Sequence, residues 1–146
     1  MFVIADLHFG QARVAARRGF DSLDAMEGLI IANWNAVVGA NDLVWVLGDV
    51  GRGPSLAKLS LIAGEKRLVA GNADDIDALV SRRAFSRIYA SKKVGRRLLT
   101  HLPVHPSLLA GGLINIHGHL HDRRLGSNRH VCVSVEQVNY APLRIG

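Results

Sequence analysis

The sequence predicts a layered α/β protein with a mixed sheet or two packed sheets. Short apolar segments recur along all 146 residues, with helical patterns between the early ones and mostly further strands later. These segments are continuously apolar rather than alternating, which is typical of a sheet covered on both faces. No linker or internal repeat divides the chain, so we expect a single domain over residues 1–146.

The first half of the chain is predicted to alternate strands with helices. A strand at 2–5 is followed by a basic connection at 10–20 that we expect to be mobile. Apolar residues at helical spacing then predict a helix that begins near Ser22, ends near Gly39 and buries one face. That face consists of Leu23, Met26, Ile30, Trp34 and Val37. A strand at 43–47, a helix from Pro54 to Gly64 and a strand at 66–70 follow.

The second half is predicted to contain mostly strands. A short helix at 76–80 precedes strands near 87–90 and 97–100, which a turn at Gly95 separates. A proline-containing loop at 102–112 comes next. Strands at 113–117 and 130–135 complete the predicted order.

The composition excludes several classes of protein. Hydrophobic residues make up 49% of the chain and no low-complexity tract is present, which argues against disorder. No apolar run approaches the roughly 18 residues that cross a bilayer, and a strand at 2–5 leaves no room for a signal peptide. Cys132 is the single cysteine, so no internal disulfide can form. We therefore expect a cytoplasmic protein without a membrane partner, in which Cys132 is a small buried hydrophobe.

The chain is basic, with a net charge of +6 and a sequence pI near 10.2. Much of the charge comes in the doublets Arg17-Arg18, Arg82-Arg83, Lys92-Lys93, Arg96-Arg97 and Arg123-Arg124. A positive surface attracts phosphate-bearing partners. No aromatic residues interleave with the doublets, however, so a platform for single-stranded nucleic acid is not supported. We expect the doublets to be solvated, and nucleic acid is a less favoured partner than a small phosphorylated molecule.

Five short segments carry side chains that bind metals, and each follows a predicted strand. They are Asp6-Leu7-His8, Gly48-Asp49, Gly71-Asn72, Thr100-His101 and Gly118-His119-Leu120-His121. In open α/β sheets ligands bind outside the carboxyl ends of the strands, so we expect the segments to converge on one edge. Carboxylates, imidazoles and an amide oxygen suit divalent metals, and too many are present for one tetrahedral ion. The number favours two metals that share a bridging carboxylate, a device that clamps the oxygens of a phosphoryl-transfer reaction.

The spacing within these segments favours metal binding. Asp6 and His8 are two residues apart, as are His119 and His121, and residues two apart in an extended chain point to the same side. We therefore expect each pair to reach a metal without unusual backbone geometry. Asp49 is the best candidate for a bridging ligand, because a carboxylate can hold one ion on each oxygen. Mixed oxygen and imidazole donors fit manganese, iron, zinc or nickel.

Four of the five segments also have an ordinary structural explanation, whereas His117, His119 and His121, three imidazoles in five residues, are the strongest single indication of a metal. Asp6 can cap the following element, Gly48-Asp49 and Gly71-Asn72 can be turns, and His101 can be a buried histidine satisfied by hydrogen bonds. All five in this order, each after an apolar segment, make a coincidence improbable.

With these residues in this order, the chain resembles the calcineurin-like metallophosphoesterase superfamily, and in particular its small bacterial and phage phosphoesterases. The likeness extends from Ile4 to His121 and covers five motifs, the third of which reads Gly71-Asn72-Ala73-Asp74. It implies a single metallophosphoesterase domain with a four-layer αββα fold, in which a two-sheet sandwich is flanked by helices.

The resemblance also implies two divalent ions, with manganese expected first and iron, zinc or nickel as alternatives. The first ion would be held by Asp6, His8, Asp49 and His121. The second would be held by Asp49, Asn72, His101 and His119. We expect Asp49, His101 and His119 to be the catalytic residues. The implied mechanism is in-line attack on phosphorus by a hydroxide that bridges the two metals.

One position departs from the superfamily pattern. The third motif usually reads Gly-Asn-His-Asp or Gly-Asn-His-Glu, and its histidine is thought to stabilise the transition state or protonate the leaving group, which Ala73 cannot do. Because the ligands are retained, we expect a phosphodiesterase that hydrolyses small phosphodiesters or nucleotides, including 2′,3′-cyclic ones, rather than a monoesterase. His105 and His117 are candidate replacements for the missing acid, and Arg52 is a candidate for steering the phosphate. The alternatives are a nuclease, and a metal-binding scaffold or regulator with weakened catalysis.

Overall fold

The chain folds into two β-sheets with helices packed against one of them. A computed structural model describes residues 1–146. Its helices are α1 (Ala12–Arg17), α2 (Leu23–Val37) and α3 (Ile76–Ser81), with 3₁₀ segments η1 (Gly53–Leu61), η2 (Pro106–Leu108), η3 (Ala110–Gly112) and η4 (Val135–Gln137). One sheet contains, in spatial order, β4 (Arg87–Tyr89), β3 (Glu65–Val69), β2 (Leu43–Val46), β1 (Phe2–Ile4) and β9 (Leu143–Arg144). The other contains β5 (Lys92–Val94), β6 (Arg97–Leu99), β7 (Ile114–His117) and β8 (His130–Cys132).

Parallel pairing brings the carboxyl ends of the central strands together. Strands β1 to β4 are all parallel, with Phe2 opposite Val44 and Leu68 opposite Ile88, and only the edge strand β9 is antiparallel. In the second sheet β6, β7 and β8 are parallel, and β5 is antiparallel to β6. Both sheets are therefore mixed, as expected. The segments that follow β1, β2 and β3 leave the first sheet at one edge.

The two sheets meet at the carboxyl end of β1. The backbone nitrogen of Ala5 donates to the carbonyl of Val133 at 2.8 Å, and the nitrogen of Val135 donates to the carbonyl of Ala5 at 3.1 Å. Ala5 thus forms a parallel bridge with Ser134, just beyond β8. This junction places the end of β1 beside the end of the second sheet.

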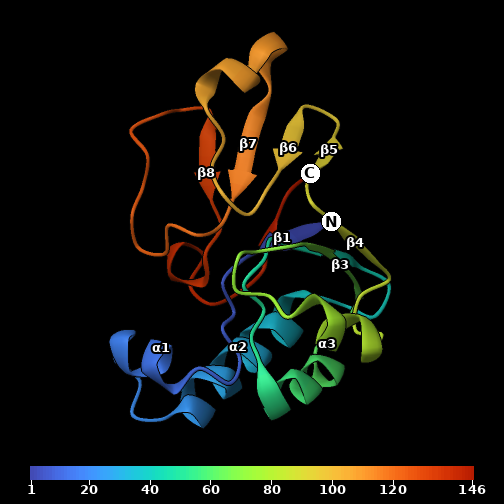
Figure 1. Cartoon of the computed structure of the whole chain (residues 1–146), viewed down its shortest axis with the longest axis vertical. Helices are drawn as coiled ribbons and strands as arrows, with labels where there is room; N and C mark the ends of the chain where they lie inside the picture. The colour runs from blue at the N-terminus through green and yellow to red at the C-terminus, as the bar shows by residue number, and fades with distance from the viewer.

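Both faces of β1 are buried, which explains its continuously apolar sequence. Phe2 and Ile4 belong to a core of 19 buried residues shared with the helices. Val3 and Ala5 point the other way and belong to a smaller core of eight residues, which also contains residues of the second sheet. Figure 1 shows the resulting order of layers, with the helices below the five-stranded sheet and the four-stranded sheet above it.

Helix α2 confirms the prediction made from apolar spacing. Ser22 caps it by accepting a hydrogen bond from the nitrogen of Ala25 at 3.0 Å. Met26 and Trp34 are completely buried, and the indole nitrogen of Trp34 donates to a backbone carbonyl. Val37 is 44% exposed and lies outside the buried face.

The helix–sheet–sheet part of the expected αββα arrangement is present, but the fourth layer contains no α-helix. The last α-helix in the chain is α3. The outer face of the four-stranded sheet contacts the segment between β6 and β7 instead. There the backbone nitrogen of Val104 donates to Asn115, and its carbonyl lies 2.8 Å from the Nε2 atom of His130. Two short 3₁₀ turns, η2 and η3, are the regular structure of this segment.

Four local expectations were wrong. Residues 12–17 form helix α1 rather than an irregular connection, because Val14 and Ala15 are buried against the neighbouring structure. The helix expected from Pro54 is a 3₁₀ segment. The strands expected near 87–90 and 97–100 are present as β4 and β6, but the turn at Gly95 connects β6 to an additional strand, β5, rather than to β4. Cys132 is only half-buried, with its sulfur 3.2 Å from the hydroxyl of Ser134.

No helix combines the length and apolar composition needed to cross a bilayer.

Candidate metal centre

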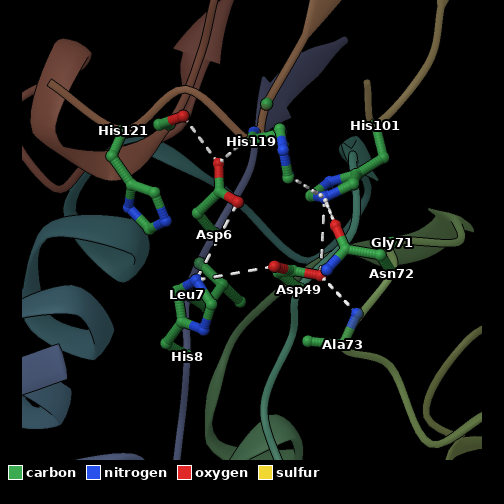
Figure 2. A network of polar contacts seen from close by, with 12 residues as sticks. Asp6, Leu7, His8, Asp49, Gly71, Asn72, Ala73, His101, His119 and His121 are labelled. Carbon is green, nitrogen blue, oxygen red and sulfur yellow. Dashed lines mark hydrogen bonds and ion pairs between the residues drawn. The ribbon is translucent and has the colours of Figure 1, made fainter. Parts of the chain in front are cut away.

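The residues expected to bind metal lie together at the carboxyl ends of the strands (Figure 2). Six of them form two groups, and within each group the potential ligand atoms lie within 4.8 Å of one another. The first group is Asp6, His8 and His121. The second group is Asp49, His101 and His119. Each group combines residues that follow strands of different sheets.

Asp49 belongs to the second group but also borders the first, and each of its oxygens faces a histidine of a different group. Its Oδ2 atom is 3.7 Å from the Nε2 atom of His8, and its Oδ1 atom is 3.5 Å from the Nε2 atom of His101. The backbone nitrogen of Ala73 donates to Oδ1 at 2.9 Å, which fixes the carboxylate plane. This is the arrangement that a bridging carboxylate requires.

The unpaired polar atoms of the first group fit a cation. Asp6 Oδ1 and both ring nitrogens of His8 are buried without a hydrogen-bond partner. Leaving such a group unpaired costs about 1–3 kcal/mol. Burial, together with the nearby charge of Arg18, lowers the pKa of His8 to about 4, so its ring is neutral at pH 7 and has a lone pair to donate. A divalent cation would satisfy these lone pairs together.

The other oxygen of Asp6 is held by the second sheet. Asp6 Oδ2 accepts hydrogen bonds from the hydroxyl of Ser134 at 2.6 Å and from the backbone nitrogen of His119 at 2.8 Å. Burial nevertheless raises the pKa of Asp6 above its usual value. A cation at Oδ1 would oppose this effect, because an adjacent positive charge favours the ionised carboxylate.

His121 is oriented by a carboxylate that lies behind it. Its Nδ1 atom is 2.8 Å from Oε1 of Glu136, and the same oxygen accepts a hydrogen bond from Nε of Arg18 at 2.7 Å. Burial acts to raise the pKa of Glu136, but the hydrogen bonds from His121 and Arg18 outweigh it and lower the pKa to about 2. The bond to Glu136 raises the pKa of His121. It also directs Nε2 away from Glu136, as is typical of metal-binding histidines.

In the second group, His101 provides the atom on which the other side chains converge. Its Nδ1 atom lies 2.8 Å from the carbonyl of Leu47, and a proton on Nδ1 would donate to that carbonyl and leave the lone pair of Nε2 for a cation. That Nε2 is 2.9 Å from Asn72 Oδ1, 3.2 Å from His119 Nδ1 and 3.5 Å from Asp49 Oδ1. Asn72, the seventh expected ligand, therefore joins the second group.

The backbone of these segments is unusual, contrary to our expectation from residue spacing. Five of the seven expected ligands have positive φ: Asp6 (60°), His8 (53°), Asp49 (53°), His119 (68°) and His121 (54°). The chain leaves β1, β2 and β7 through residues with left-handed backbone, so the alternation of an extended strand does not apply there. Non-glycine residues adopt this conformation at a cost and cluster in it at functional sites.

Two further features keep the loops close together. A side chain at Gly48 would place its Cβ atom 2.5 Å from His101 Nδ1, so a glycine is needed where these segments touch. The carboxylate of Asp74 accepts hydrogen bonds from the backbone nitrogens of Asp49, Val50 and Gly71. Asp74 thereby joins the loop after β2 to the loop after β3.

The sequence did not indicate the supporting roles of Arg18, Ser134, Glu136 and Asp74. Arg18 belongs to a basic doublet that we expected to be solvated, yet its side chain is 3% exposed and paired with Glu136. It also donates to the carbonyl of Asp6 at 2.7 Å. Asp74 stands inside the third motif, which was the one available signal for it.

The candidate replacements for the missing acid do not contact the expected ligands through hydrogen bonds. His105 is exposed and its ring bonds to Ser107. His117 is buried, its Nδ1 atom lies 2.8 Å from the carbonyl of Gly118, and burial lowers its pKa.

Arg52, the candidate for steering the phosphate, is exposed, and its side chain makes no ion pair.

Fold and site together define a two-sheet α/β protein with two adjoining groups of potential metal ligands. The chain belongs to the family of the uncharacterized protein MJ1445 from Methanocaldococcus jannaschii. The two sequences are 31% identical over 160 aligned residues, which cover 99% of this chain and 86% of MJ1445. It is 39% identical to the Gene 66 protein of Mycobacterium phage D29 over 77 residues, which cover 48% of this chain and 38% of the phage protein. The crystal structure of AQ665 from Aquifex aeolicus, a protein of unknown function, has a TM-score of 0.80 at 25% identity and aligns over 98% of this chain and 94% of its own. No protein-family model matches the sequence.

Proposed function

We propose that this protein is a phosphodiesterase of the calcineurin-like metallophosphoesterase superfamily that uses two divalent metal ions. Its substrates would be small phosphodiesters or nucleotides, including 2′,3′-cyclic ones. The observation that carries the proposal is the position of Asp49, whose two oxygens face His8 at 3.7 Å and His101 at 3.5 Å. One carboxylate between two groups of imidazole ligands is the geometry expected of a dinuclear centre.

The side chains divide into two sets of ligands. Asp6, His8, Asp49 and His121 would hold one ion. Asp49, Asn72, His101 and His119 would hold the other. Manganese is the ion we expect first, because carboxylate, amide and imidazole donors occur together. When bound, two such ions lower the pKa of water and neutralise charge on phosphoryl oxygens.

Side chains around the site hold the expected metal ligands in fixed orientations. Ser134, Glu136 and Asp74 orient the ligands or their loops, so little rearrangement is needed during the reaction. His101 and His119 line the side of the site on which Asn72 lies, and they would contact the phosphate oxygens indirectly, through their ion.

The missing general acid restricts the substrates. The methyl group of Ala73 cannot donate a proton, although its backbone nitrogen retains a hydrogen bond to Asp49. Substrates whose leaving group departs without protonation should therefore react best. Aryl esters and strained cyclic diesters belong to this class, whereas alkyl monoesters do not.

Metal analysis and a substrate panel test this proposal together. Purified protein should bind two manganese ions per chain and hydrolyse bis(p-nitrophenyl) phosphate faster than p-nitrophenyl phosphate. Two bound ions without hydrolysis of any diester would instead support a metal-binding scaffold. One bound ion, or none, would contradict the dinuclear centre.

A further inference from the structure

A cavity of about 520 Å³ opens beside the candidate metal centre. Its lining includes His119 and His121, so it is continuous with both groups of ligands. The other lining residues come from α1, the segment after β7 and the region of η4: Arg17, Arg18, Leu120, Asp122, Arg123, Glu136 and Tyr140. Figure 1 shows α1 and the connection that follows β7 on the same side of the molecule.

The three arginines of this cavity differ in their partners. Arg18 is committed to Glu136 and to the carbonyl of Asp6. Arg17 and Arg123 are exposed and make no ion pair, so both guanidinium groups are free to bind an anion. Asp122 is the one acidic residue of the lining that Arg18 does not neutralise.

Free guanidinium groups in a concave site suit phosphate. Each can donate two parallel hydrogen bonds to phosphate oxygens, which is stronger and more specific than the contact of a single ammonium group. The volume lies within the range of small-ligand sites, and a nucleotide fits such a site. Tyr140, packed edge-on against Phe20 at 5.4 Å, adds an aromatic surface to the cavity.

We propose that Arg17 and Arg123 bind a second phosphate group of the substrate. This inference rests on the proposed phosphodiesterase activity and narrows its substrate class. The preferred substrates are nucleotide-sized diesters that carry one phosphate besides the one that is cleaved. The scissile phosphate lies at the metal ligands, and the additional phosphate lies in the cavity beside His121.

A matched pair of substrates tests the proposal. Thymidine 3′-(p-nitrophenyl phosphate) is compared with its 5′-phosphorylated form, because the scissile bond and the leaving group are the same in both. The 5′-phosphate should lower KM roughly tenfold or more, the effect of one or two charge-assisted hydrogen bonds, and leave kcat nearly unchanged. The double variant Arg17→Ala/Arg123→Ala should abolish this difference and leave the unphosphorylated substrate unaffected.

The control variant is Arg13→Ala/Arg82→Ala, which removes the same charge from exposed positions outside the cavity. An equal loss of the KM difference in this control would show general attraction to a basic surface and overturn the proposal. Equal KM values for the two substrates in the unmodified protein would also overturn it, while the phosphodiesterase function would stand.

Direct binding separates this inference from the proposed activity. Adenosine 3′,5′-bisphosphate should bind at least tenfold more tightly than adenosine 5′-monophosphate in calorimetry, and only the Arg17→Ala/Arg123→Ala variant should lose the difference. If that result appears without hydrolysis of any diester, the phosphate site stands and the proposed activity fails. If neither preferential binding nor hydrolysis is seen, both are wrong.

Discussion

His121 and Glu136 are joined by a hydrogen bond of 2.8 Å between Nδ1 and Oε1. The bond fixes the rotation of the imidazole ring, and it leaves Nε2 as the atom available to a cation. Because Arg18 donates to the same oxygen at 2.7 Å, the carboxylate is held from two sides. Glu136 is therefore expected to contribute to metal affinity without touching the metal.

Replacing Glu136 tests this role. Glu136→Gln keeps the shape of the side chain but removes the charge that orients His121. Affinity for the ion of the first group should fall roughly 10- to 100-fold, with little change at the second group. Titration with manganese, followed by calorimetry, measures both sites. Glu65→Gln, an exposed carboxamide variant on β3, serves as the control and should bind like the unmodified protein.

Asp49→Asn should be the most damaging single change among the expected ligands. Asp49 alone directs one oxygen at each group, and without its charge two cations would repel each other more strongly. Hydrolysis of bis(p-nitrophenyl) phosphate at saturating manganese should fall by ~10²-fold or more. Asp21→Asn, at an exposed position, should have no effect. The bridging assignment is wrong if Asp49→Asn retains both ions while His8→Ala is equally severe.

The substitution Ala73→His should restore help for poor leaving groups. A well-placed acid accelerates cleavage by about 10²–10⁴-fold, although the loop at Ala73 is not shaped around an imidazole, so the gain should lie at the lower end. The rate ratio between the variant and the unmodified protein is measured across diesters whose leaving groups differ in pKa. The ratio should rise with leaving-group pKa. A constant ratio would show that another residue already supplies the proton.

His8 should make the metal-free protein sensitive to acid. Burial and the charge of Arg18 lower its pKa in the folded state to about 4 from the ordinary value of 6.5, so the unfolded state binds more protons between these values. The stability that the neutral ring contributes is complete above pH 6.5 and is lost as the pH falls towards 4. Between pH 7 and pH 5 the free energy of unfolding should drop by about 2 kcal/mol from this residue.

Urea unfolding in the presence of a chelator, repeated at several pH values, measures this effect. Comparison with His8→Gln isolates it from other titrating groups, including His121, whose raised pKa acts in the opposite direction. Identical pH profiles for the two proteins would contradict the assigned pKa of His8.

The strands and the main helix could be predicted because their signals are local. Continuous apolar runs predicted β1 and β2, and helical spacing with a capping Ser22 predicted α2. Helix α1 was missed because it is six residues long and has no side-chain cap, so burial of Val14 and Ala15 by tertiary contacts decides its conformation. Short helices depend on such packing.

The types of metal ligand could also be predicted, but their backbone conformation and the residues that hydrogen-bond to them could not. The left-handed φ values at Asp6 and His121 could not be predicted from the spacing of residue types, because the surrounding structure imposes them. Ser134 contacts Asp6 across 128 positions of the chain, and Arg18 contacts Glu136 across 118. Contacts of such separation follow from the meeting of the two sheets, which no local pattern contains.

The junction at Ala5 gives the metal centre a mechanical role. Asp6 and His8 follow a strand of the five-stranded sheet, whereas His121 follows a strand of the four-stranded sheet, and the second group is divided in the same way. An ion bound by either group would therefore connect the two sheets, whose shared core contains eight buried residues. Metal binding and the packing of one sheet on the other would then be thermodynamically linked, so the free metal concentration would set how stable the contact between the sheets is.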